Sequence, residues 1–234
     1  MKKKILITIL IVIIIAIVLI ALSVFLDIQQ ETKLKTELIE ISDLSNAENI
    51  DIEAINQRLE RTVTTGDYAI VEQSFKEYLK DNFNNSIKIA EILNDEKLTH
   101  LLTAENYLED GKDFIETKNY ITTTKQTLEE CKTTYTEFFT EEKAMSYINE
   151  KRLDDYYVDL YKQDLVGDIK EPSSDYTTVQ NSIDEIIQIL NISEEVINFL
   201  SENQDSWQII NEKIVFHNTI LSNEYDTLVN QLSK

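Results

Sequence analysis

Few residues in this chain are of the types that do chemistry: it has two histidines, His100 and His217, and one cysteine, Cys131. A metal enzyme built on a helical bundle uses a Glu-x-x-His pair, because that spacing points both ligands at one ion. Glu96 lies four residues before His100 and Glu212 lies five residues before His217, so neither pair has this spacing. Zinc needs several Cys or His ligands, and none of these three residues is paired at ligand spacing. The sequence therefore predicts no metal site and no cofactor.

The motifs of other catalytic sites are also missing. Three scattered glycines cannot form a phosphate-binding loop, and there is no Asp-x-Asp-x-Asp-Gly calcium loop. Cys131 falls on a core row of an expected helix, which favours a small buried residue over a catalytic thiol. His217 lies between Ile214 and Leu221 on an expected core-facing row, where a partly buried imidazole is more common than a ligand or general base. We expect no enzyme and assign no catalytic, cofactor-binding or metal residue.

The densest run of acidic and aromatic residues extends from Leu153 to Tyr161. Asp155 and Asp159 are one helical turn apart, a spacing that would bind a divalent cation weakly or dock a basic ligand. The simpler interpretation, which we prefer, is that Tyr156 and Leu160 pack inward while the two acids are solvated.

An apolar segment from Ile5 to Leu26 precedes everything else, with Thr8 and Ser23 as its polar residues and no charge. As a helix it would be about 33 Å long, which is enough to cross the hydrocarbon core of a bilayer. The basic residues 2–4 place the N-terminus in the cytoplasm. The sequence therefore predicts a cytoplasmic segment 1–4, a transmembrane signal anchor 5–26, and an extracytoplasmic remainder of a single-pass protein.

A cleaved signal peptide is the alternative for this segment, because a basic start, an apolar middle and small residues at Ala21 and Ser23 are all present. The apolar run is longer than a usual signal core and has no A-x-A site, so we prefer the retained anchor.

The part beyond the anchor is strongly acidic. The chain has 22 Lys and Arg and 43 Asp and Glu, and residues 2–4 account for three of the lysines, which leaves a formal charge of −24. Phosphates would be repelled, so we expect no nucleic-acid partner. With one cysteine there is no intramolecular disulfide, which for an extracytoplasmic domain fits a bacterial protein.

The elements that carry these residues are expected to be helices. Residues 27–48 continue the helical spacing as a stalk, and residues 49–234 are expected to form an antiparallel bundle. Three glycines and one proline predict long helices with few connections. No segment alternates polar and apolar residues well enough for a strand, so the fold class is all-α.

Individual helices follow from the apolar rows. Phe114, Ile121, Leu128 and Tyr135 recur every seven residues. Thr140 begins a further helix, expected to continue to Leu165. The last expected helix carries Trp207, Ile210, Ile214, Leu221, Leu228 and Leu232.

An internal similarity suggests duplication. Asp67-Tyr68-x-x-Val71-x-x-Ser74-x-x-Glu77 matches Asp175-Tyr176-x-x-Val179-x-x-Ser182-x-x-Glu185, and both copies open a long helix. Two duplicated helical hairpins would explain the match, and a shared helix-start pattern in a chain of biased composition is the alternative.

Two functions remain for such a layout. The first is a structural or protein-interaction module at a bacterial cell surface, with a partner in the cell envelope. The second is an extracytoplasmic ligand-binding or sensor-like module, since a membrane helix followed by a helical domain resembles the sensor bundles of bacterial chemoreceptors in layout, though in no motif. An exposed apolar or Tyr-rich patch would favour the first, and a pocket lined by Tyr156, Tyr161 and His217 would favour the second.

Overall fold

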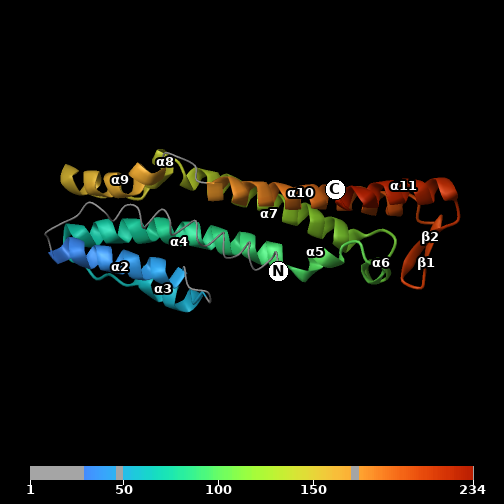
Figure 1. The fold of residues 1–234 in the computed structure, drawn as a ribbon, viewed down its shortest axis with the longest axis horizontal. Helices are drawn as coiled ribbons and strands as arrows, with labels where there is room; N and C mark the ends of the chain where they lie inside the picture. Colours follow the sequence, from blue (N-terminus) through green and yellow to red (C-terminus); the bar gives the residue numbers. More distant parts are fainter. Residues whose placement is uncertain (1–28, 46–49, 170–173, 234) are drawn as a thin grey trace. The chain divides into compact units, whose positions relative to one another are not determined.

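The computed structural model describes residues 29–45, 50–169 and 174–233, and this part of the chain is mostly helical (Figure 1). The prediction of an all-α protein is confirmed in this coarse form. The elements, in chain order, are α2 (Gln29–Ser45), α3 (Ile52–Glu60), α4 (Asp67–Asn94), α5 (Glu96–His100), α6 (Ala104–Asp110), α7 (Ile115–Phe138), α8 (Glu141–Ser146), α9 (Asp155–Ile169), α10 (Ser174–Glu202), β1 (Trp207–Ile210), β2 (Lys213–Phe216), α11 (Thr219–Val229) and the 3-10 helix η2 (Asn230–Ser233).

The predicted segments 1–4 and 5–26 lie outside the described residues. Among the helices of residues 29–45, 50–169 and 174–233, none is both long enough and apolar enough to cross a membrane. The anchor therefore stays a prediction from sequence.

Helix starts follow the expected capping chemistry. Asp51 caps α3 by accepting a hydrogen bond from the backbone N of Ala54 at 2.9 Å. Thr140 caps α8 by accepting one from the backbone N of Lys143 at 3.2 Å. The Thr140 cap confirms the helix start expected from sequence, and in both helices a short oxygen-bearing side chain satisfies an amide that the helix itself leaves unpaired.

The chain divides into two compact units, which we call unit 1 and unit 2. Unit 1 takes the described residues up to Ala90 together with Cys131–Gln180, and unit 2 takes Glu91–Glu130 together with Asn181 onward. Helices α4, α7 and α10 contribute residues to both units.

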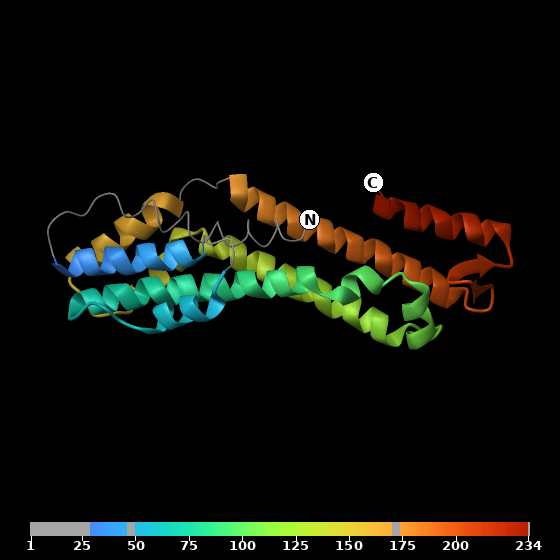
Figure 2. The same cartoon turned by 60° about the horizontal axis from the view of Figure 1, so that its bottom comes forward.

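The core of unit 1 includes the helix that was expected to be a stalk. Leu34, Leu38 and Ile41 of α2 are buried in one hydrophobic cluster with residues of α3, α4, α8 and α9. Phe75 of α4 lies against Tyr161 of α9, with ring centroids 4.6 Å apart. Helix α2 is therefore a packed member of unit 1, and Figure 2 shows it running alongside α4.

The core of unit 2 confirms the seven-residue row of α7. Phe114, Ile121 and Leu128 are fully buried. Trp207 stacks on Phe114 at 6.1 Å between ring centroids, and its indole Nε1 donates to the carbonyl of Leu200 at 2.8 Å.

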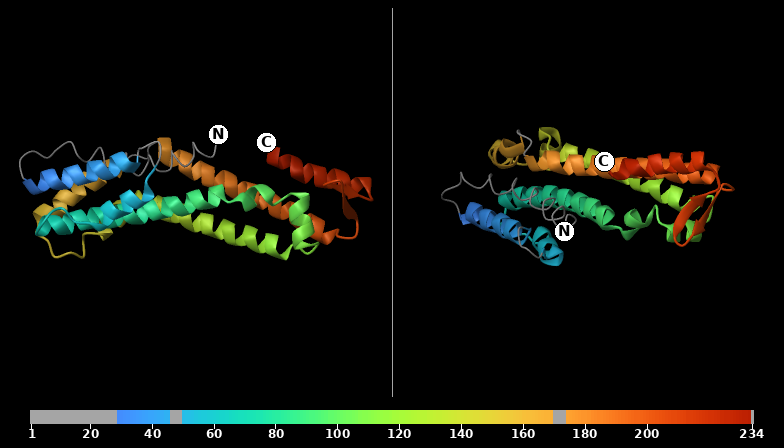
Figure 3. Two further views of the ribbon diagram at one scale, coloured as in Figure 1. Left: turned by 90° about the horizontal axis from the view of Figure 1, so that it is seen from below. Right: turned by 45° about the vertical axis from the view of Figure 1, so that its right-hand side comes forward.

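The prediction of one helix from Trp207 to Leu232 is wrong in its first half, and with it the prediction that the chain has no strand. Strands β1 and β2 form an antiparallel hairpin in which Trp207 pairs with Phe216 and Ile210 pairs with Lys213. The turn residues Asn211 and Glu212 have φ values of 50° and 60°, the left-handed pair that a two-residue hairpin turn requires. The second half, α11, is helical as expected, and Figure 3 shows it leaving the hairpin.

The prediction of one helix from Thr140 to Leu165 is also wrong. Helix α8 ends at Ser146 and α9 begins at Asp155, so a break separates the two. Gly167 lies within α9, whereas Gly66 and Gly111 have φ values of 65° and 74° and lie at breaks between helices.

Candidate functional site

The residues singled out from the sequence do not form one site. Cys131 is buried, as expected. His217 is exposed after β2, where its backbone N donates to the carbonyl of Ser206 at 2.9 Å, so its expected core-facing position is wrong. The error has the same source as the missed hairpin, because a strand and a bend replace the helix that would have turned this side chain inward.

The expected pocket of Tyr156, Tyr161 and His217 is not formed. Tyr161 is fully buried and its hydroxyl donates to the carbonyl of Ala144 at 2.9 Å, so it lines no open site. Tyr156 is 53% exposed rather than packed inward, and its hydroxyl donates to a carboxylate oxygen of Glu31 at 2.9 Å. His217 belongs to the other unit.

The acidic pair near Tyr156 is solvated, as preferred from the sequence. Asp155 and Asp159 are exposed while Leu160 is buried. Over the described residues, no group of three or more His, Cys, Asp or Glu side chains is placed to hold a metal ion.

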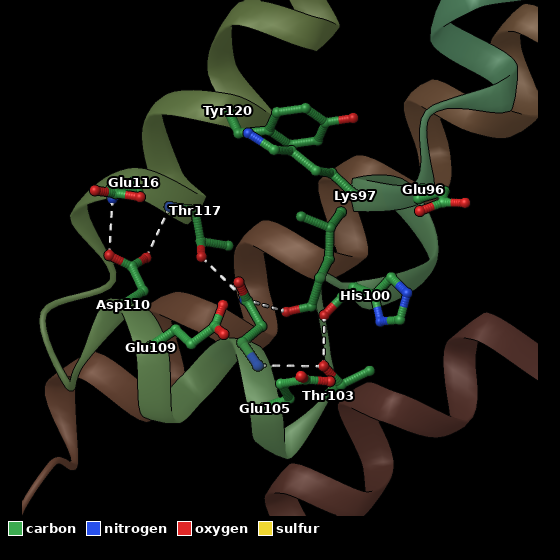
Figure 4. Close-up of a pocket in the computed structure, with 12 residues that line it drawn as sticks. Glu96, Lys97, His100, Thr103, Glu105, Glu109, Asp110, Glu116, Thr117 and Tyr120 are labelled. Atoms are coloured by element: carbon green, nitrogen blue, oxygen red, sulfur yellow. Dashed lines mark hydrogen bonds between the residues drawn. The ribbon is translucent and has the colours of Figure 1, made fainter.

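Unit 2 contains a pocket of about 410 Å³ that the sequence did not indicate (Figure 4). It is bounded by α5, α6 and the first turns of α7. Twelve residues line it: Glu96, Lys97, His100, Leu101, Thr103, Glu105, Asn106, Glu109, Asp110, Glu116, Thr117 and Tyr120.

Two aspartates position the walls of this pocket. Asp110 accepts hydrogen bonds from the backbone N of Glu116 at 3.0 Å and of Thr117 at 2.7 Å, and so caps the start of α7. Burial by itself raises the pKa of Asp110, but these hydrogen bonds from Thr117 and Glu116 outweigh it and the net pKa is lowered. Asp95 accepts a hydrogen bond from the hydroxyl of Tyr120 at 2.8 Å. The pKa of the Tyr120 phenol is raised, mainly because the group is buried and in addition because the Asp95 carboxylate is close.

The charged side chains that line the pocket are mainly acidic, and most of the acidic ones are exposed to solvent. Glu96, Glu105, Glu109 and Glu116 are exposed, and Lys97 is the one Lys or Arg among its described lining residues. The carboxylates therefore remain hydrated, and such a pocket attracts small organic cations without the buried anchoring groups that confer high affinity.

Unit 1 contains a buried ion network. Lys76 and Glu72 of α4, with side chains 2% and 0% exposed, form an ion pair at 2.8 Å. Lys76 also pairs with Glu37 of α2 at 3.0 Å and donates to the carbonyls of Arg58 and Arg61 at 2.8 and 2.9 Å. Every donor of the ammonium group is thereby used, which offsets the cost of burying the charge.

The two carboxylates of this network are equally well satisfied. Glu72 accepts hydrogen bonds from the backbone N of Val63 and Thr64 and from the Thr64 hydroxyl, the last at 2.6 Å. Glu37 accepts from Arg58 at 3.1 Å and is paired with Arg61. Burial by itself raises the pKa of both carboxyl groups, but the hydrogen bonds and nearby positive charges outweigh it, so both pKa values are lowered. The network fixes the segment before α4 against α2, and it leaves no open position for a ligand.

The C-terminal part of unit 2 exposes apolar side chains. In α11, which the structure describes throughout, no residue is buried, and Ile220 at its start is 73% exposed. On the outer face of the hairpin, Ile210 and Val215 are also exposed. We call these residues, with the half-buried Leu221 and Leu228 of α11, the C-terminal apolar surface.

This surface is continuous with the core through aromatic contacts. Phe216 of β2 lies 5.4 Å from Tyr225 of α11 and 5.9 Å from Phe199 of α10, between ring centroids. The inner side of the hairpin is therefore packed, whereas its outer side is exposed and no residue of α11 is buried.

Comparisons of the chain with protein-family models, with curated proteins and with solved structures give no match.

Proposed function

We propose that the chain is a single-pass, membrane-anchored helical module at a bacterial cell surface, whose function is to bind another protein of the cell envelope. The C-terminal apolar surface is the observation that carries this proposal. Helix α11 has no buried residue and begins with an isoleucine that is 73% exposed, and exposed apolar surface of this kind marks interaction sites.

Placement in the membrane is part of the proposal and is supported by sequence. The uncharged run from Ile5 to Leu26 follows the basic residues 2–4, which favours a cytoplasmic N-terminus and an extracytoplasmic bundle. The antiparallel arrangement of the bundle and the duplication of residues 67–77 and 175–185 belong to the same proposal.

Accessibility labelling tests the placement. A cysteine is added after Lys234 in a Cys131→Ser background, and right-side-out spheroplasts are treated with a membrane-impermeant maleimide. The proposal expects labelling in intact spheroplasts and a full-length protein that stays with the membrane after carbonate extraction. Labelling only after lysis contradicts the orientation, and an N-terminus that begins beyond Leu26 shows cleavage.

Ligand binding is the second candidate, and the acidic pocket of unit 2 is the observation that favours it. The probe is spermidine, a linear organic cation, titrated calorimetrically into the full-length chain in detergent and into a Glu105→Gln/Glu109→Gln variant. A dissociation constant well below 1 mM that the variant raises at least tenfold favours ligand binding. Equal, weak heats for both proteins favour the interaction module.

A further inference from the structure

We propose that the C-terminal apolar surface docks a basic, amphipathic polypeptide segment, in which apolar residues on one side are flanked by Lys or Arg. This inference rests on the proposed function and adds the chemistry of the partner.

The charge around the surface carries the argument. Residues 181–233 contain nine Asp or Glu and one basic residue, Lys213. The acidic residues are Asp184, Glu185, Glu194, Glu195, Glu202, Asp205, Glu212, Glu224 and Asp226. A partner with basic flanks would meet a predominantly negative field, which speeds association and rejects acidic competitors.

Three lysines of unit 2 contact this region, and one of them pairs with an acid in it. Glu194 pairs with Lys125 at 2.8 Å, whereas Lys112 and Lys118 of the same unit donate to the carbonyl of Trp207 and the hydroxyl of Ser201. On α11 itself, Glu224 and Asp226 are exposed. These two exposed carboxylates, which we call the acidic rim, are therefore available to a partner's cations.

The apolar part supplies the anchor. Leu221, Tyr225, Leu228 and Leu232 recur at intervals of four, three and four residues, and each is only half-buried. This is the row along which a second helix packs against the first. Because the residues of this row are half-buried, an added helix would bury the part of each side chain that is still exposed.

A second copy of the chain fits this surface less well. In a two-fold dimer the same acidic surface lies on both sides of the interface, so the exposed acids of both copies, Glu224 and Asp226 among them, are brought to it. Like charges brought together at an interface oppose association. The outer hairpin face carries one Lys, Lys213, which is too little to compensate nine acids.

Designed peptides test the inference directly. The full-length chain is held in nanodiscs of zwitterionic lipid, and three fluorescent 14-residue peptides are titrated by anisotropy: an amphipathic Leu/Lys helix, its Leu/Glu counterpart, and a Leu/Lys peptide scrambled to have no apolar face. We expect the amphipathic basic peptide to bind at least about tenfold more tightly than either of the others. Equal binding of the scrambled and amphipathic basic peptides would overturn the proposal.

Matched variants locate the binding. Ile220→Ser removes an isoleucine that is 73% exposed, and Leu108→Ser removes a leucine of α6 in the same unit that is 70% exposed. We expect Ile220→Ser to weaken the basic peptide at least fivefold and Leu108→Ser to change its affinity less than twofold. Circular dichroism checks that both variants keep the helical content. Equal losses in the two variants would overturn the assignment of the surface.

The rim is tested by charge reversal. Glu224→Lys with Asp226→Lys is expected to weaken the basic peptide at least tenfold and to reduce the dependence of its affinity on salt between 50 and 300 mM. Unchanged affinity would overturn the charge argument. Sedimentation that shows a dimer of the parent chain, lost in Ile220→Ser, would assign the surface to a second copy and overturn the proposed partner. The labelling experiment above does not involve α11, so peptides that do not bind would leave the proposed membrane placement unchanged. Labelling only after lysis would instead refute the proposed function itself.

Discussion

Replacing Lys76 by methionine is expected to destabilise unit 1 far more than removal of any surface lysine. The Lys76 ammonium lies 3.0 Å from Glu37 and 2.8 Å from Glu72, and it donates to two backbone carbonyls. Methionine keeps most of the side-chain volume but leaves two buried carboxylates without their shared cation. Removing one partner of a buried ion pair costs about 3–5 kcal/mol, because the remaining charge stays in a poorly solvating environment.

Lys80→Met is the matched control, one turn further along α4. Lys80 pairs with Glu60 at 3.1 Å, but the two side chains are 41% and 66% exposed. Ion pairs of this kind contribute about 0–1 kcal/mol, since water screens the attraction. The two substitutions therefore differ mainly in burial.

Urea unfolding of the full-length chain in detergent, followed by circular dichroism, measures the difference. Hydrogen exchange gives a local readout, because the backbone amides of Val63 and Thr64 donate to Glu72. A loss of 3 kcal/mol corresponds to about a hundredfold faster exchange when reclosing is much faster than the chemical exchange step. If Lys76→Met costs no more than Lys80→Met, the network does not stabilise unit 1 and the reasoning fails.

Three further outcomes are expected from the same contacts. The folded-state pKa values of Glu37 and Glu72 are lowered from the ordinary 4.5, so the stability that these carboxylates contribute is present above pH 4.5 and is lost as the pH falls through the lowered values. Acid unfolding followed by circular dichroism should show this loss of stability, and Glu72→Gln should make the loss smaller. Gly111→Ala should cost about 1–3 kcal/mol in urea unfolding, because φ 74° with ψ 179° is a conformation that alanine adopts only with strain, and an unchanged midpoint would contradict that. Trp207→Ala should cost about 3–5 kcal/mol because this side chain is 3% exposed; a loss below about 1 kcal/mol in thermal or urea unfolding would show that unit 2 does not depend on it.

Much of the helical architecture could be predicted because its causes are local. The heptad row of α7 and the Thr140 cap both depend on residues within a few turns of each other, so spacing and capping chemistry are sufficient. The hairpin was missed because its turn uses Asn211-Glu212 without a glycine, and because Trp207, Ile210 and Ile214 also fit a helical row. Burial of Trp207 against Phe114, which only the tertiary structure shows, favours the strand.

The candidate sites could be predicted less well than the helices. The ion network joins Glu37, Arg58, Arg61 and Glu72 around Lys76, residues of three segments that come together only on folding. Its one local signal is the Glu72-Lys76 spacing of four residues, which in a chain with 43 acids is unremarkable. The C-terminal apolar surface could not be predicted because the leucines of α11 have the spacing of a core row. Only the structure shows that no residue of α11 is buried.

The central claim is that the C-terminal apolar surface binds a protein in the cell envelope. A photoactivatable phenylalanine analogue at position 220 in living cells tests it most directly, with the same analogue at position 108 as the control. The account predicts a crosslink at Ile220, absent at Leu108, to a peptide that mass spectrometry identifies as apolar with flanking Lys or Arg. No crosslink at position 220, or the same crosslinks from both positions, would contradict it.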